Sequence, residues 1–196
     1  MKQLYSSTLV MYNTALVLFA MLISTALHGQ ALNSNWKQDL DNAMKEFLSC
    51  QATTDVNSPC NKFLGESLNT VYRINDFYSQ SLGRYMVAAE IAKYVKSSEQ
   101  WSLLGPGYDQ KTLTQAQAHA NARKAVVAVY MSSSGGGHVV LITPGTLQSS
   151  GSWELSVPNA ASFFLSQPDR SFINKGLSFA FGKILIKDIL IYTRKY

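Results

Sequence analysis

The pattern of apolar and polar residues divides the chain into a helical first half and a strand-rich second half. In the first half, apolar residues recur every three or four positions, as on one face of a helix. The predicted helices span residues 36–47, 60–72, 85–95 and 112–123, with a turn-rich segment at 101–107. The predicted strands span residues 125–131, 139–142, 153–157 and 184–193, with a short helix at 160–165. Helices followed by a meander of strands predict an α+β fold with an antiparallel sheet.

Residues 1–30 have the pattern of a secretory signal peptide. Lys2 is followed by an uncharged apolar stretch at 14–27 and by small residues around Gly29. We expect cleavage close to Ala31, which would leave residues 31–196 as a single exported domain, periplasmic or extracellular and without a stable membrane anchor. The alternative is a retained anchor, since the apolar character begins at Leu4 and could span a bilayer.

Composition limits the classes of partner. The 196 residues are 46% hydrophobic and carry a net charge of +5, of which the leader contributes only Lys2. A modest basic excess suits an anionic cell envelope, although it could equally be an ordinary soluble surface. No arginine-rich helix or basic–aromatic motif supports nucleic-acid binding. Because no Cys/His cluster has zinc spacing, we expect neither a metal nor another cofactor.

Two residues stand where nucleophilic chemistry would need them. Cys60 follows a proline and begins a helix, and the helix dipole and free amides there would lower the pKa of its thiol. His138 follows three glycines and begins a strand, where the backbone can approach a ligand closely. Of the other histidines, His28 leaves with the leader, and His119 lies in a polar helical stretch that looks solvent-facing. We hypothesise that Cys60 and His138 form a nucleophile–base pair, although each alone is more often a structural residue.

Acyl transfer by such a pair needs two further features. A third polar group should orient the imidazole, and we expect it on the strand that follows the histidine. Glu154 is the first candidate and Asn159 the second, although Glu154 could equally be a solvated surface charge. Free amides at the start of the Cys60 helix would hold the oxyanion of the tetrahedral intermediate.

The segments Pro-Cys60-Asn-Lys-Phe and Gly-His138-Val-Val-Leu-Ile resemble the papain-like peptidoglycan amidases and endopeptidases, which include the NlpC/P60 and CHAP groups and the related amidase effectors of type VI secretion. The resemblance covers about residues 57–160 and includes the last predicted strand. It implies a papain-like fold with N-terminal helices packed on an antiparallel sheet. It also implies that Cys60 and His138 are catalytic, with Glu154 or Asn159 as the third residue. No clear match exists to the aspartate or glutamine often found just ahead of the nucleophile.

The resemblance also implies a substrate, which is the peptidoglycan stem peptide or its amide link to the sugar. Because an antibacterial effector would not normally need a secretory signal, an enzyme of the cell's own envelope or a secreted lysin is favoured. We expect a monomer, for which a protein inhibitor would be a further partner. Amidase and endopeptidase activities remain alternatives, as do the cell's own wall and a competitor's wall.

A different class of function stays open beside the hydrolase. Cys50 closes one predicted helix and Cys60 opens the next, so the two could form a disulfide in an exported protein. The protein would then be a non-catalytic envelope or wall-binding protein in which His138 is structural. A transglutaminase or acyltransferase could use the same pair of residues. Trp101, Tyr108 and Trp153 could line a groove, although aromatic residues more often belong to a core.

Overall fold

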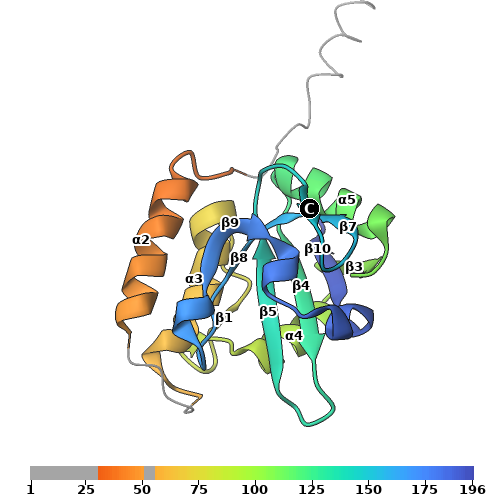
Figure 1. Cartoon of the computed structure of the whole chain (residues 1–196). Coiled ribbons are helices and arrows are strands. Elements are labelled where there is room, and N and C mark those ends of the chain that lie inside the picture. The colour runs from red at the N-terminus through yellow and green to blue at the C-terminus, as the bar shows by residue number, and fades with distance from the viewer. Residues whose placement is uncertain (1–30, 51–55) are drawn as a thin grey trace, which may run out of the picture.

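A six-stranded antiparallel sheet forms the centre of the molecule (Figure 1). The computed structural model describes residues 31–50 and 56–196, so the expected leader and its cleavage site lie outside the described residues. In spatial order the strands are β3 (Trp101–Pro106), β10 (Leu190–Arg194), β4 (Val126–Met131), β5 (Gly137–Ile142), β8 (Asn159–Ser162) and β9 (Phe172–Gly176). Every neighbouring pair in this sheet is antiparallel, which confirms the predicted α+β class with an antiparallel sheet.

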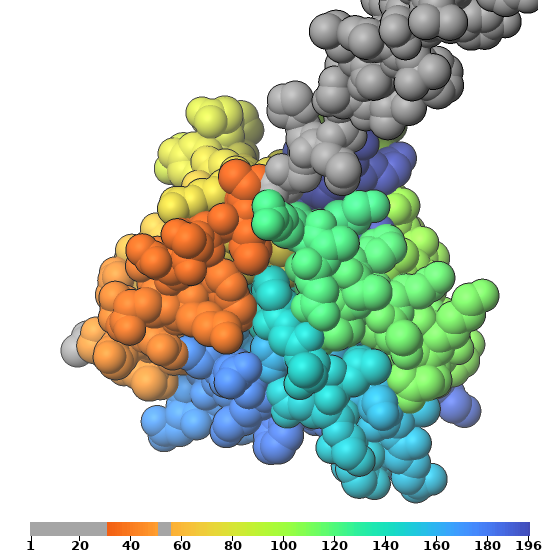
Figure 2. Space-filling model, turned by 90° about the horizontal axis from the view of Figure 1, so that it is seen from above, coloured from red at the N-terminus to blue at the C-terminus, as the bar shows by residue number. Residues whose placement is uncertain are grey.

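Helices cover the sheet on both faces. The helices on one face are α2 (Trp36–Ser49), α3 (Lys62–Tyr72), which the short helix η1 (Pro59–Asn61) precedes, and α4 (Ala88–Ser97). On the other face lies α5 (Gln110–Asn121). Figure 2 shows α2 (orange) and α5 (green) on opposite sides of the molecule, with the cyan residues that follow β5 between them. The helices before residue 100 therefore pack on the sheet as expected, and α5 adds a layer on the second face.

The central strands are apolar on both faces, which explains the two layers of helices. In β5, Val139 and Leu141 face α2, α3 and α4, whereas Val140 and Ile142 face α5. Successive side chains of a strand point to opposite faces, so a continuous apolar run indicates a strand that is covered on both sides. All four of these side chains are buried.

Three sequence predictions of secondary structure are wrong. The segment 160–165, expected to be a helix, contributes to β8, in which Ala160 and Ala161 pair with β5. The segment 101–107, expected to be a turn, contains β3, which pairs with β10 along the sheet edge. The predicted strand 184–193 is divided between the 3-10 helix η4 (Lys183–Asp188) and β10. In the first two segments, pairing with distant strands outweighs the local preference.

Small elements complete the structure around the sheet. They are the hairpins β1 (Tyr78–Ser79) with β2 (Arg84–Tyr85) and β6 (Gln148–Ser150) with β7 (Leu155–Val157), and the 3-10 helices η2 (Pro168–Arg170) and η3 (Leu177–Phe179). The strand β7 thus begins two residues later than the predicted strand 153–157. Among the residues that the structure describes, no helix has the length and apolar character needed to cross a bilayer.

Candidate functional site

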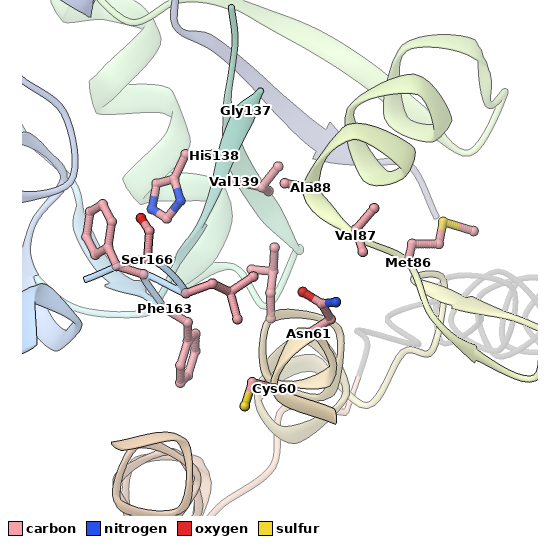
Figure 3. Close-up of a pocket in the computed structure, with 13 residues that line it drawn as sticks. Cys60, Asn61, Met86, Val87, Ala88, Gly137, His138, Val139, Phe163 and Ser166 are labelled. Atoms are coloured by element: carbon pink, nitrogen blue, oxygen red, sulfur yellow. The ribbon is translucent and has the colours of Figure 1, made fainter. Parts of the chain in front are cut away.

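A pocket of about 180 Å³ lies where β5 begins, between the first turns of α3 and α4. Its walls come from four segments: η1 with Cys60 and the start of α3, residues 86–88, residues 137–139 with His138, and residues 163–166 after β8. Figure 3 shows Cys60 and His138 entering from different walls, with Phe163 directed toward the Cys60 side. The two segments singled out in the sequence therefore meet at one pocket.

Cys60 is not a free thiol in this structure. Its sulfur forms a disulfide with Cys50, the residue after the end of α2, and none of the described cysteines is free. Cys60 is also buried in the core between α2, α3 and the sheet, with only 1% of its surface exposed. Because only a thiolate is nucleophilic, the oxidised form cannot carry out the proposed attack. The alternative pairing of Cys50 with Cys60 is the one that the structure contains.

His138 is held by polar and aromatic contacts that do not include Cys60. Its Nε2 lies 2.7 Å from the hydroxyl of Ser162, and its ring stacks on Phe164 with centroids 4.3 Å apart. The edge of Phe181 packs against the ring at 5.6 Å. Burial, followed by the positive charge of Arg170, lowers the pKa of His138 from 6.5 to about 4. The imidazole is therefore neutral at pH 7 and can either donate to or accept from the hydroxyl.

The two side chains face different directions within the shared pocket. Strand alternation places His138 on the same face as Val140 and Ile142, the side on which Phe181 lies. Cys60 belongs to the core of the opposite face, and its sulfur is directed toward α2 (Figure 3). A direct Cys60–His138 contact would need both an open disulfide and a rotated imidazole.

Glu154 does not orient the imidazole. It lies in the turn before β7 with a φ of 59° and is exposed. Its carboxylate accepts a hydrogen bond from Lys183 Nζ at 2.7 Å, and this bond lowers the pKa of Glu154. The left-handed turn directs it to the surface, where its role is the solvated charge that the sequence also allowed.

Asn159 does not reach the imidazole either. Its amide donates to the Thr143 hydroxyl at 2.8 Å, and its oxygen accepts from Gln148 Nε2, also at 2.8 Å. Thr143 is five residues along the chain from His138, which corresponds to about 16 Å in an extended strand. Asn159 therefore fixes the far end of the sheet instead of the candidate site.

Ser162 takes the position that sequence reasoning gave to Glu154 or Asn159. It is fully buried on β8. The β5–β8 register pairs Leu141 with Ala161, and its continuation places Phe164 opposite His138. Ser162 is the diagonal neighbour of His138 on the same face, within reach of a long or aromatic side chain. Only the strand assignment of residues 159–162 could have revealed this partner, and the sequence pattern predicts a helix there.

Of the three aromatic residues that could line a groove, two are buried and one is exposed. Trp101 is buried, stacks on Phe77 and donates from Nε1 to Asp76 at 3.0 Å, and Trp153 is also buried. Tyr108 is 54% exposed. His119, expected to face solvent, is only partly exposed, and its Nδ1 lies 3.0 Å from the Thr193 hydroxyl.

Metal-binding side chains do not gather anywhere in the described part of the chain, where no group of three or more His, Cys, Asp or Glu residues could hold an ion. No protein-family model matches the chain, and no curated protein sequence matches it at a significant level. The chemistry of the pocket itself is therefore the basis for inferring a function.

Proposed function

We propose that the protein is an exported cysteine hydrolase that cleaves amide bonds in peptidoglycan peptides, and that the structure represents its oxidised, inactive form. The observation that carries the proposal is the shared pocket, in which the start of the Cys60 helix and the start of the His138 strand form facing walls. We propose further that the arrangement is papain-like, with a nucleophile at a helix start and a base on the antiparallel sheet.

The chemistry begins with reduction of the Cys50–Cys60 disulfide by a dithiol. Two electrons and two protons convert the bridge into two thiols, and the dithiol becomes a disulfide. The helix dipole at the start of α3 then favours the Cys60 thiolate, and a rotated His138 accepts its proton. The thiolate attacks the carbonyl carbon of a substrate amide, and amides of the first helical turn hold the oxyanion.

The second half of the reaction releases the products. The His138 imidazolium gives its proton to the departing amine, leaving an acyl group on the Cys60 sulfur. Water, deprotonated by the imidazole, attacks the thioester, and the acid product leaves with the thiolate restored. In this scheme Ser162 holds the imidazole in the oxidised form, where the 2.7 Å contact keeps it away from the sulfur.

The substrate is inferred from charge and the expected route of the chain. The net charge of +5 suits an anionic wall, and the apolar leader would carry the domain to it. We propose action on the cell's own envelope or as a secreted lysin, by a monomer without a cofactor.

A second candidate function has its own supporting observation. Cys60 is in a disulfide and buried, and His138 is neutral and bonded to a buried serine. These features also fit a non-catalytic envelope protein, in which the disulfide ties α2 to α3 and the pocket serves only for binding.

The test compares oxidised and reduced protein, starting at Ala31, on purified peptidoglycan, with released fragments identified by mass spectrometry. The wild type should release fragments only with a dithiol reductant. Cys50→Ala, which cannot form the bridge, should release the same fragments without reductant, and Cys60→Ala should release none under either condition. If neither the reduced wild type nor Cys50→Ala cleaves any of a panel of wall types, the hydrolase proposal fails and the binding protein becomes the better account.

A further inference from the structure

A second hollow, of about 390 Å³, lies between α4 and η4 at the same end of the sheet as the candidate site. Its floor is apolar and comes from two strands, with Val129 and Met131 from β4 and Leu190 and Tyr192 from β10. Met131 and Val129 pair directly across the sheet with Gly137 and Val139, which line the candidate site. The two hollows are thus lined by directly paired residues of adjacent strands.

The hydroxyl of Tyr192 is the unusual feature of this hollow. Tyr192 is only 6% exposed, and a buried tyrosine normally finds a hydrogen-bond partner for its hydroxyl. Tyr72 does so, because its hydroxyl donates to the carbonyl of Ile142 at 2.7 Å. Within residues 31–50 and 56–196, the Tyr192 hydroxyl forms no hydrogen bond, and every fully buried side-chain polar atom there has a partner. The Tyr192 hydroxyl is therefore not fully enclosed, and Tyr192 is one of the residues that line the hollow.

Tyr192 can act as a donor at neutral pH. Burial raises the pKa of its hydroxyl above 10, so the proton stays on the oxygen. A protonated hydroxyl that borders an apolar floor favours a ligand with an acceptor oxygen beside a nonpolar group.

The charged groups around the hollow favour an anion. Lys96 enters from α4 and Lys187 from η4, and both are exposed. In the described chain neither lysine forms an ion pair with a carboxylate. Among the described residues, Asp188 is the one acidic residue that lines the hollow, so the charged residues described there sum to one net positive charge.

We propose that this hollow binds the free carboxylate end of a short peptide, with the terminal apolar side chain on the floor. The carboxylate accepts hydrogen bonds from the Tyr192 hydroxyl and lies close to Lys96 and Lys187. The identity of the peptide rests on the proposed function, since a peptidoglycan stem peptide ends in D-alanine, which offers a methyl group beside a carboxylate. The strands β10 and β5 are two strand spacings apart, which is about 10 Å. Three extended peptide residues cover about the same distance, so a short peptide could reach from this hollow to the candidate site.

The test measures binding to the disulfide-intact protein, so it does not depend on catalysis. The probes are diacetyl-L-lysyl-D-alanyl-D-alanine and the same peptide with a C-terminal amide, titrated by calorimetry or NMR. The free acid should bind at least about tenfold more tightly than the amide, because hydrogen bonds to a charged carboxylate are stronger than those to a neutral amide. Tyr192→Phe, which keeps the buried ring, should weaken binding of the acid by about two- to twelvefold.

Charge variants provide the matched comparison. Lys187→Gln should weaken binding of the acid by up to about fivefold, and Asp188→Asn should tighten it. Lys93→Gln makes the same charge change on the exposed surface of α4, outside the hollow, and should leave the affinity as it is.

The outcomes separate this proposal from the proposed function. Equal binding of acid and amide, no binding of either, or wild-type affinity in Tyr192→Phe would each overturn the subsite. Selective binding of the acid by a protein that never cleaves peptidoglycan would keep the subsite and reject the hydrolase. Cleavage of peptidoglycan by a protein that does not bind the free acid would keep the hydrolase and reject the subsite.

Discussion

Opening the Cys50–Cys60 disulfide should lower the stability of the protein by about 2.7 kcal/mol. The bridge joins residues separated by 10 positions. The loss of chain entropy from closing a loop of that size amounts to about 2.7 kcal/mol at 25 °C. Cys60 stays within an apolar core after reduction, so we expect the effect to arise mainly in the unfolded chain. A typical domain is stable by about 5–15 kcal/mol, so the reduced protein should remain folded.

The assay is urea denaturation of wild type and Cys50→Ala, each with and without a dithiol reductant. For a urea m-value of about 2 kcal/mol/M, the reductant should move the wild-type midpoint down by about 1.3 M. Cys50→Ala should already have the lower midpoint and should not respond to reductant. A wild-type shift below about 0.3 M, or an equal shift in both proteins, would refute the reasoning. The same measurement shows whether a cleavage assay under reducing conditions uses folded protein.

Two further predictions concern buried polar groups. The pKa of His138 is about 4 in the folded protein and 6.5 in the unfolded chain, so the unfolded chain binds the proton more readily. The free energy of unfolding should therefore fall by up to about 3 kcal/mol as the pH drops from 6.5 to 4. Urea titrations across this range should show a smaller fall for His138→Phe, and parallel curves would contradict a buried neutral imidazole. Asp76→Asn should lower the free energy of unfolding by about 3 kcal/mol or more. The largely buried Asp76 carboxylate accepts hydrogen bonds from Arg194 Nε at 2.7 Å and from Trp101 Nε1 at 3.0 Å. The control is Glu154→Gln, which removes the exposed ion pair with Lys183. A shift of the urea midpoint for Asp76→Asn no larger than that for Glu154→Gln would contradict the prediction.

Local patterns were sufficient for the helices and for the two central strands. In α2, Trp36, Leu40, Met44 and Phe47 recur at helical spacing, and all four are buried. The valine-rich runs of β4 and β5 indicate strands by residue type alone. The strand β8 lacks such a signal, because Asn-Ala-Ala-Ser has no strand preference and becomes extended only by pairing with β5 and β9.

The candidate site was predictable in its parts but not in its contacts. The sequence indicated that Cys60 begins a helix and that His138 begins a strand, and both line one pocket. It could not indicate the direction of the imidazole, because β5 is apolar on both faces and alternation does not identify which face meets α3. The contact with Ser162 and the bond to Cys50 depend on how distant segments are brought together.

The position of β10 has a consequence for how the chain reaches its folded state. This strand follows all the others in the sequence, yet it lies between β3 and β4 and pairs with both. The edge strand β3 therefore cannot join the sheet until residues 190–194 have been synthesised, and the contacts that join it connect residues far apart in the chain. Topologies of this kind fold slowly, since the entropy of large loops must be lost before the pairing is gained. A chain that ended before residue 190 would leave β3 without a partner strand, so residues 101–106 join the sheet last.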